Sequence, residues 1–257
     1  MMYSKWRGLC GILSLAVSLT LLGCGVNGNS YVRVVNASQG LSGFTVVAGQ
    51  TALVSGLPFG TEGVQQQGQY STIDMSGNYR PLGSGTGQAL IAYTTPGNNL
   101  VSTTQSFIKS TPYTIVVESP APAIEFQVLT DDNTAPASGS YSLRVVDTSV
   151  RAGAVDVYIT AVGAAPGGTP VVGNMTYQQV TNPYLSLSPG TLEVQVTPAG
   201  NPNKVLAIQP FSPAAGKIYS LFFLDFPNGA AGVVPPPNPP VPGTNTYTVL
   251  VTNDPAM

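Results

Sequence analysis

The stretch Tyr31-Val-Arg-Val-Val-Asn-Ala-Ser38 decides the fold, because a close copy of it, Ser142-Leu-Arg-Val-Val-Asp-Thr-Ser149, returns later in the chain. In the first copy, the apolar residues Val32 and Val34 alternate with Arg33. Alternation with a period of two is typical of a β-strand with one buried face and one face in water. The repeated stretch therefore predicts the same β-strand in each of two similar units.

Further matches between the two halves follow in the same order along the chain, with small gaps. They pair Phe44-Thr-Val-Val-Ala48 with Val155-Asp-Val-Tyr-Ile159, Tyr70 with Tyr184, Gly77 with Gly190, Pro112-Tyr-Thr-Ile-Val-Val117 with Ile218-Tyr-Ser-Leu-Phe-Phe223, and Leu129-Thr-Asp-Asp132 with Val251-Thr-Asn-Asp254. A fixed order of matches indicates an internal duplication. We therefore expect two units, residues 30–133 and 140–257, joined by a linker over residues 134–139 that contains Pro, Gly and Ser.

Both units have the pattern of an all-β domain. Short alternating segments are separated by Pro and Gly, as in Leu57-Pro-Phe-Gly60 and Ser188-Pro-Gly190. About seven short strands per 100 residues, with regular turns, favour two facing antiparallel sheets. The sequence therefore predicts an all-β protein made of two tandem immunoglobulin-like antiparallel β-sandwiches.

The pattern V-R-V-V-[ND]-x-S, a strand of the Val-Asp-Val-Tyr type, a Gly-bounded hairpin, Y-[TS]-[IL]-[VF] and a closing L-T-D-D-N resembles a family of bacterial envelope repeats, the domain of unknown function DUF4397. The resemblance implies immunoglobulin-like sandwiches in a lipoprotein and attaches no activity to them. The first copy departs from the pattern, since Phe44-Thr45 stands where the second copy has Val155-Asp156.

The N-terminus carries Lys5 and Arg7, an apolar run from Leu9 to Leu22, and Leu21-Leu-Gly-Cys24. The run is too short to span a bilayer, which takes roughly 20 apolar residues. It resembles a bacterial lipoprotein signal peptide, which implies cleavage before Cys24 and acylation of that cysteine. We therefore expect a signal peptide over residues 1–23 and a lipidated tether over residues 24–29. An ordinary secretory signal with an incidental cysteine is the alternative.

Composition limits the function classes. Removal of residues 1–23 takes away Lys5 and Arg7 and leaves a formal charge of −4, without a basic stripe for nucleic acid. The two cysteines are Cys10 and Cys24, so the mature chain would have no disulfide. The absence of His removes Ser-His-Asp and Cys-His catalysis and the commonest metal ligand. We expect a protein that is not an enzyme and has no cofactor.

Asp131, Asp132 and Asn133 lie where the two units meet and offer oxygen ligands for Ca²⁺. The alternative is a strand end at which these side chains cap nearby backbone amides. The second unit keeps the similar Thr252-Asn253-Asp254 at the chain end, which favours the local role.

Arg33 and Arg144 occupy equivalent positions on the first strand of each unit. A functional arginine there would bind a carboxylate or phosphate with both ends of its guanidinium. The alternative, which we favour, is an exposed cross-strand ion pair, with Asp147 and Asp156 as partners for Arg144.

A proline-rich segment over residues 233–243 separates the last two strands of the second unit. Such a segment adopts the polyproline II conformation, which either offers a partner-binding loop or stiffens a hairpin tip. The prolines that would contact a partner are Pro235, Pro236, Pro237, Pro239, Pro240 and Pro242.

Three aromatic pairs recur in the matched halves: Tyr70 with Tyr184, Tyr113 with Tyr219, and Phe107 with Phe211. Exposed rings would stack on sugars, whereas buried rings would pack the core. Matched spacing in both units favours the core.

Together these features predict a non-catalytic, lipid-anchored protein of the bacterial cell envelope, whose sandwiches stand in series and serve protein interaction or envelope assembly. Gly25 after the cysteine implies the outer membrane, and the expected partners are the membrane and an envelope protein or polysaccharide. One alternative is an accessory lipoprotein that binds carbohydrate or another ligand. A more remote alternative is a hydrolase, which would need carboxylates that converge in one cleft.

Overall fold

The computed structural model describes residues 28–38, 41, 43–66, 69–71, 79–118, 124–225 and 247–254. All regular secondary structure in these ranges is β-strand, which confirms the predicted all-β class. This part of the chain contains no helix with the length and apolar character needed to cross a membrane. Cys24, Gly77 and the proline-rich segment lie outside the described residues.

The first repeat contains two sheets. One sheet has the order β10 (Glu125–Thr130), β9 (Pro112–Glu118), β1 (Asn29–Asn36), β4 (Thr61–Gln66) and β5 (Gln69–Ser71), and β6 (Arg80–Gly83) also pairs with β1. The other sheet has the order β3 (Thr51–Leu57), β2 (Phe44–Ala48), β7 (Gly85–Thr95) and β8 (Asn98–Phe107).

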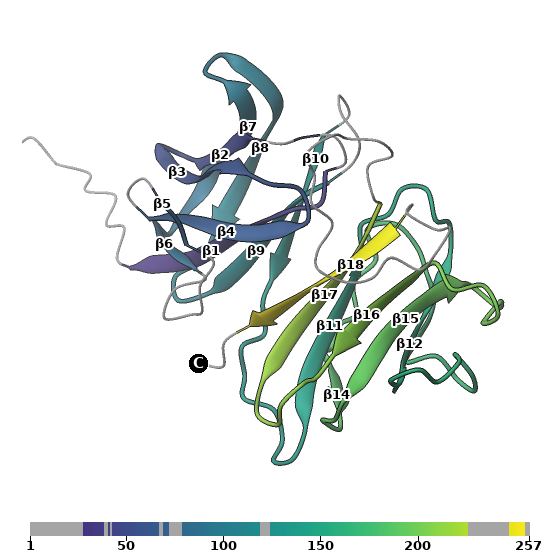
Figure 1. Ribbon diagram of the computed structural model, residues 1–257. Helices are drawn as coiled ribbons and strands as arrows, with labels where there is room; N and C mark the ends of the chain where they lie inside the picture. The colour runs from purple at the N-terminus through teal and green to yellow at the C-terminus, as the bar shows by residue number, and fades with distance from the viewer. Residues whose placement is uncertain are drawn as a thin grey trace, which may run out of the picture.

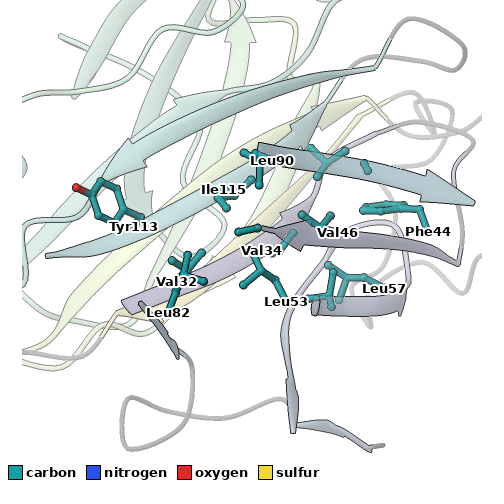
Figure 2. Packing of buried hydrophobic residues seen from close by; sticks show 14 of the residues in the cluster. Val32, Val34, Phe44, Val46, Leu53, Leu57, Leu82, Leu90, Tyr113 and Ile115 are labelled. Carbon is teal, nitrogen blue, oxygen red and sulfur yellow. The ribbon is translucent and has the colours of Figure 1, made fainter. Parts of the chain in front are cut away.

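The alternating apolar residues of these strands form the core between the two sheets. Figure 2 shows Val32 and Val34 of β1 facing Val46 of β2 and Leu90 of β7. All four side chains are completely buried. The predicted sandwich therefore forms because alternate residues of strands such as β1, β2 and β9 enter one common apolar layer.

The second repeat has the same plan with fewer strands. One sheet has the order β14 (Leu185–Leu187), β11 (Tyr141–Asp147), β17 (Ile218–Asp225) and β18 (Tyr247–Asp254). The other has the order β13 (Val172–Met175), β12 (Val155–Ala161), β15 (Leu192–Pro198) and β16 (Ala207–Phe211). A second apolar cluster, which includes Leu143, Val145 and Phe223, fills the space between them.

One strand pair in each repeat departs from the antiparallel expectation. β1 pairs with β9 in parallel, with Arg33 opposite Thr114, and β11 pairs with β17 in parallel, with Arg144 opposite Ser220. The equivalent pairs therefore place an arginine beside a hydroxyl side chain in both repeats.

The two repeats pack back to back through the sheets that contain β1 and β11 (Figure 1). A third apolar cluster joins them, with Val35 and Val116 from the first repeat and Val146, Phe222 and Leu224 from the second. The sequence predicted one solvent-exposed face on these strands and two sandwiches arranged in series. Both predictions were wrong, because the outer faces of β1 and β11 contact each other. The apolar runs of β9 and β17 are typical of strands buried on both faces.

The strand registers correct two of the matches between the halves. Asp131 donates its backbone N–H to the carbonyl of Pro112, and Asp254 lies opposite the equivalent residue Ile218. Asp131, and not Asp132, is therefore the counterpart of Asp254.

The other correction concerns the tyrosine match. Arg80 lies opposite Val32, and Leu185 lies opposite the equivalent residue Leu143. Tyr79 and Tyr184 each come one position before these two residues. Tyr79, and not Tyr70 in β5, is therefore the counterpart of Tyr184. The β4–β5 hairpin lengthens this part of the first repeat and shifts the alignment.

Candidate functional site

The two repeated arginines lie in the interface between the repeats. Arg33 projects from β1 and Arg144 from β11, each on the strand face opposite to its own sandwich core. Their side chains are 0% and 1% exposed. The expectation of an exposed cross-strand ion pair was therefore wrong, because the second repeat covers the face that a single sandwich would leave in water.

Each arginine forms its shortest ion pair with an aspartate of the other repeat. Arg33 Nη1 lies 2.7 Å from Asp254 Oδ1, and Arg144 Nη1 lies 2.6 Å from Asp131 Oδ1. Both carboxylates are fully buried. The arrangement is reciprocal, as expected for an interface between two similar units related by an approximate twofold axis.

A hydroxyl side chain completes the network in each repeat. Arg33 donates from Nε to Thr114 Oγ1 over 2.8 Å, and that hydroxyl donates to Asp131 over 2.7 Å. In the second repeat, Arg144 donates from Nε to Ser220 Oγ over 3.0 Å, and Ser220 donates to Asp254. We call these four charged residues and two hydroxyl residues the charge network.

A tyrosine ring covers each guanidinium. The Cζ atom of Arg33 lies 5.2 Å from the ring centre of Tyr79, and that of Arg144 lies 5.2 Å from the ring centre of Tyr184. Tyr79 also donates its hydroxyl to Asp131. Cation–π contacts of this kind strengthen when water is excluded.

The charges of the network support one another. Burial on its own would lower the pKa of Arg33, but Asp254, with further contributions from Tyr79, Glu62 and Asp131, raises the pKa well above its ordinary value. Burial would raise the pKa of Asp131, but Arg144 and Arg33 lower it below its ordinary value. Burial also opposes the charge of Arg144, but Asp131 raises its pKa above the ordinary value. Both arginines and Asp131 therefore stay charged at neutral pH.

The network has one asymmetric member, Glu62 of β4. Its Oε2 atom accepts a hydrogen bond from Arg33 Nη1 over 3.0 Å, and its side chain is 21% exposed. Burial raises the pKa of Glu62 in spite of Arg33. The second repeat has Val180 at the corresponding position, where it forms a single bridge with Val146. Only the first repeat therefore adds a third carboxylate.

A second polar contact between the repeats centres on Gln178. Its side-chain Nε2 donates to Glu118 and Glu125, each over 2.9 Å, and its backbone carbonyl oxygen accepts a hydrogen bond from Gln127 Nε2 over 2.6 Å. Gln178 has a positive φ of 65°. At the equivalent turn of the first repeat, a glycine, Gly60, adopts nearly the same φ of 67°. A left-handed conformation costs energy for a residue with a side chain, so this contact offsets local strain.

The three calcium candidates differ in their neighbours. Asp131 is held in the charge network, whereas Asp132 Oδ1 accepts the backbone N–H of Thr134 over 3.0 Å. Asn133 is buried beside them. Within the described ranges, no group of three or more acidic, His or Cys residues is placed to hold a metal ion.

The two partners expected for Arg144 lie elsewhere. Asp147 accepts the backbone N–H of Ser149, and Asp156 accepts those of Asn174 and Gly200. That expectation was wrong because it considered one repeat alone, whereas Arg144 crosses to Asp131.

Four of the matched aromatic residues pack edge to face, in one contact within each repeat. The ring centres of Phe107 and Tyr113 are 5.3 Å apart, and those of Phe211 and Tyr219 are 5.2 Å apart. Phe107, Tyr113 and Phe211 are buried in the sandwich cores. The core interpretation is therefore confirmed for the matched pairs Phe107/Phe211 and Tyr113/Tyr219. These rings do not form a sugar-stacking surface.

Sequence reasoning missed Asp254, Thr114, Ser220 and Tyr79. The signal for an interface was present in Val-Arg-Val-Val and Leu-Arg-Val-Val, where an apolar residue shares the strand face of the arginine. A face with arginine and valine side by side, repeated in both halves, is typical of a covered surface with a buried countercharge.

Comparisons with known proteins give three findings. No curated protein matches the chain. A solved structure described as "Alpha-glucan binding by a streptococcal virulence factor" matches with 10% sequence identity and a TM-score of 0.25, over 75% of this chain and 92% of that chain. The family model described as "Domain of unknown function (DUF4397)" matches residues 30–158, half of the 257-residue chain. The protein therefore belongs to the DUF4397 family.

Proposed function

We propose that this protein is a non-catalytic lipoprotein of the bacterial cell envelope, which holds two β-sandwiches as one rigid body and presents their outer surfaces to an envelope partner. The observation that carries the proposal is the reciprocal pairing of Arg33 with Asp254 and of Arg144 with Asp131. On an exposed surface, these arginines could bind an anion and these aspartates could act as acids. In this protein they instead pair with each other and hold the two repeats together.

The chemistry of the charge network supports a structural role. Each arginine has a carboxylate, a hydroxyl oxygen and an aromatic ring as neighbours, in a layer bounded by Val35, Val146 and Phe222. An external anion would have to displace an aspartate and open this apolar layer. Breaking a buried ion pair costs about 3–5 kcal/mol, so such binding is unfavourable.

The sequence before β1 supports the anchor. Leu21-Leu-Gly-Cys24 has the pattern of a lipoprotein cleavage site, and β1 begins at Asn29. The five residues that follow Cys24 span at most about 18 Å when fully extended. A lipid on Cys24 would therefore keep the first repeat close to the membrane, with Gly25 favouring the outer membrane.

Lipid labelling and membrane fractionation test the anchor. Cells that produce the wild-type chain should incorporate labelled palmitate into it, and cells that produce Cys24→Ala should not. Gly25→Asp, a change beside the cysteine, should keep the label but move the protein to the inner-membrane fraction. A wild-type chain without lipid, or a Cys24→Ala chain with as much lipid as wild type, contradicts the proposal.

Protease treatment of intact cells then separates the two settings for a presented surface. Digestion without lysis places the repeats outside the cell and favours extracellular partners. Protection until the outer membrane is opened places them in the periplasm and favours an assembly role.

A further inference from the structure

β8 is the last strand of its sheet, and among the described strands it pairs with β7 alone. Its ten residues, Asn98-Asn-Leu-Val-Ser-Thr-Thr-Gln-Ser-Phe107, include no proline and no charged side chain. The strand therefore leaves one row of backbone N–H and C=O groups without a strand partner in the structure. Such an edge is a template for the addition of another strand.

Three other edge strands, β16, β3 and β13, carry features that discourage strand addition. β16, the equivalent strand of the second repeat, has five residues and includes Pro210. The pairings of β3 with β2 and of β13 with β12 contain register shifts. Prolines, short strands and bulges all discourage edge pairing. β8 is longer than β3, β13 and β16, and unlike β16 it has no proline.

The middle of β8 is regular as well as uncharged. From Val101 to Gln105 the strand pairs with β7 residue by residue, and the register shifts lie outside this run. Ser102, Thr103 and Thr104 are exposed. The hairpin of β7 and β8 extends from the first repeat on the side away from the second repeat, so the second repeat leaves this edge uncovered (Figure 1).

We propose that β8 pairs with β8 of a second copy of this chain, in antiparallel orientation and centred on Thr103, so that the two sheets become one continuous sheet. When β8 pairs with β8 of a second copy, each residue lies opposite a residue of the same strand sequence. A charged residue in the middle of β8 would therefore lie near its own copy, with the same charge. β8 carries none. Centring on Thr103 puts Thr103 opposite Thr103, Ser102 opposite Thr104, and Val101 opposite Gln105.

The opposed residues suit this register. Thr–Thr and Ser–Thr pairs across antiparallel strands stabilise a sheet through their methyl and hydroxyl groups. The pairing is isologous, so it closes at two copies and does not continue into a fibre. The inference goes beyond the proposed function and does not depend on it, because the edge is present with or without the lipid.

Disulfide crosslinking in intact cells that produce the full-length chain tests the pairing, whether or not the chain is bound to a membrane. A cysteine at the symmetry axis faces its own copy, so Thr103→Cys should give a covalent dimer under mild oxidation. Val101→Cys, Ser102→Cys, Thr104→Cys and Gln105→Cys should crosslink at least about tenfold less, because their copies lie several ångströms further apart across the strands. Gln209→Cys in β16 is the matched control, and the wild-type chain shows the background from its own cysteines.

A second variant separates specific pairing from chance collision. Ser102→Lys together with Thr104→Lys places lysines opposite each other in the proposed register, on residues that are exposed in the single chain. Added to Thr103→Cys, these changes should reduce the covalent dimer to the level of Gln209→Cys. No dimer with Thr103→Cys, equal dimer at Thr103 and Gln209, or a dimer unaffected by the two lysines would overturn the proposal.

Discussion

Arg33 in β1 and Asp254 in β18 form a fully buried ion pair with 2.7 Å between Nη1 and Oδ1. Arg144 and Asp131 form its counterpart in the opposite direction across the interface. Each repeat therefore supplies the cation for one pair and the anion for the other. Each arginine therefore depends on the other repeat for its shortest ion pair.

The first prediction concerns Asp254→Asn. The substitution keeps the shape of the side chain but leaves two buried arginines with one fully buried aspartate, so the free energy of unfolding should fall by about 3–5 kcal/mol. Urea denaturation of the purified protein measures this. Asp132→Asn, at an exposed carboxylate in the other repeat, is the control and should change stability by less than about 0.5 kcal/mol. Equal effects of the two substitutions would contradict the role of the network.

The second prediction concerns the reciprocal pair. Arg144→Met and Asp131→Asn should each be strongly destabilising, because each leaves a buried charge without its partner. The double variant removes both charges and should be more stable than the sum of the single effects implies, by on the order of 2 kcal/mol. A double-mutant cycle from urea denaturation gives this coupling energy. A coupling energy near zero would mean that the 2.6 Å contact contributes no specific stabilisation.

The third prediction concerns pH. Burial raises the pKa of Asp147 from 3.8 to about 7, and burial raises that of Glu118 from 4.5 to about 8. The folded protein therefore keeps protons that the unfolded chain has released, and the free energy of unfolding should fall as the pH rises from about 4 to about 8. This stability is fully present below the unfolded pKa values and is lost above the folded ones.

Asp147→Asn tests this dependence, since the first repeat has Asn36 at the same position. Asn36 donates its side-chain amide to the carbonyls of Leu41 and Leu57, which shows that an amide suits this site in the fold. At pH 8 the substitution should stabilise the protein by on the order of 2 kcal/mol, and at pH 4 its effect should be small. Urea denaturation at both pH values measures the difference, and an equal effect at both would refute it.

The fourth prediction concerns the turn at Gln178. Gln178→Ala loses the hydrogen bonds to Glu118 and Glu125 and keeps a side chain at φ of 65°, whereas Gln178→Gly loses the bonds but relieves the strain. The glycine variant should therefore be about 1 kcal/mol more stable than the alanine variant. Thermal unfolding of both proteins makes the comparison. An alanine variant as stable as the glycine variant would show that the turn is not strained.

The sequence was sufficient to predict the all-β class and the first strand of each repeat, because both follow from local alternation of apolar residues. Val32 and Val34 enter the core of their sandwich as alternation requires. Arg33 and Arg144 were recognised as equivalent for the same reason. Local patterns of this kind depend only on neighbours along one strand.

The partners of those arginines could not be predicted in the same way. Asp254 reaches Arg33 only because two complete sandwiches dock, and that docking depends on the shapes of both outer faces. Tyr79 was missed because the β4–β5 hairpin lengthens the first repeat and hides its match with Tyr184. The apolar neighbours Val35 and Val146 were the available sign that these faces are covered.

The measurement that tests the central claim most directly is the distance between spin labels on the two repeats. Gln50→Cys and Val162→Cys place labels on exposed positions of different repeats, in a chain whose Cys10 and Cys24 are replaced by serine. Dilution with unlabelled protein removes distances between copies. A rigid joint predicts one narrow distance distribution, which broadens when Asp254→Asn is added. A broad distribution in the otherwise unchanged chain would show that the two repeats move independently, and would contradict the account.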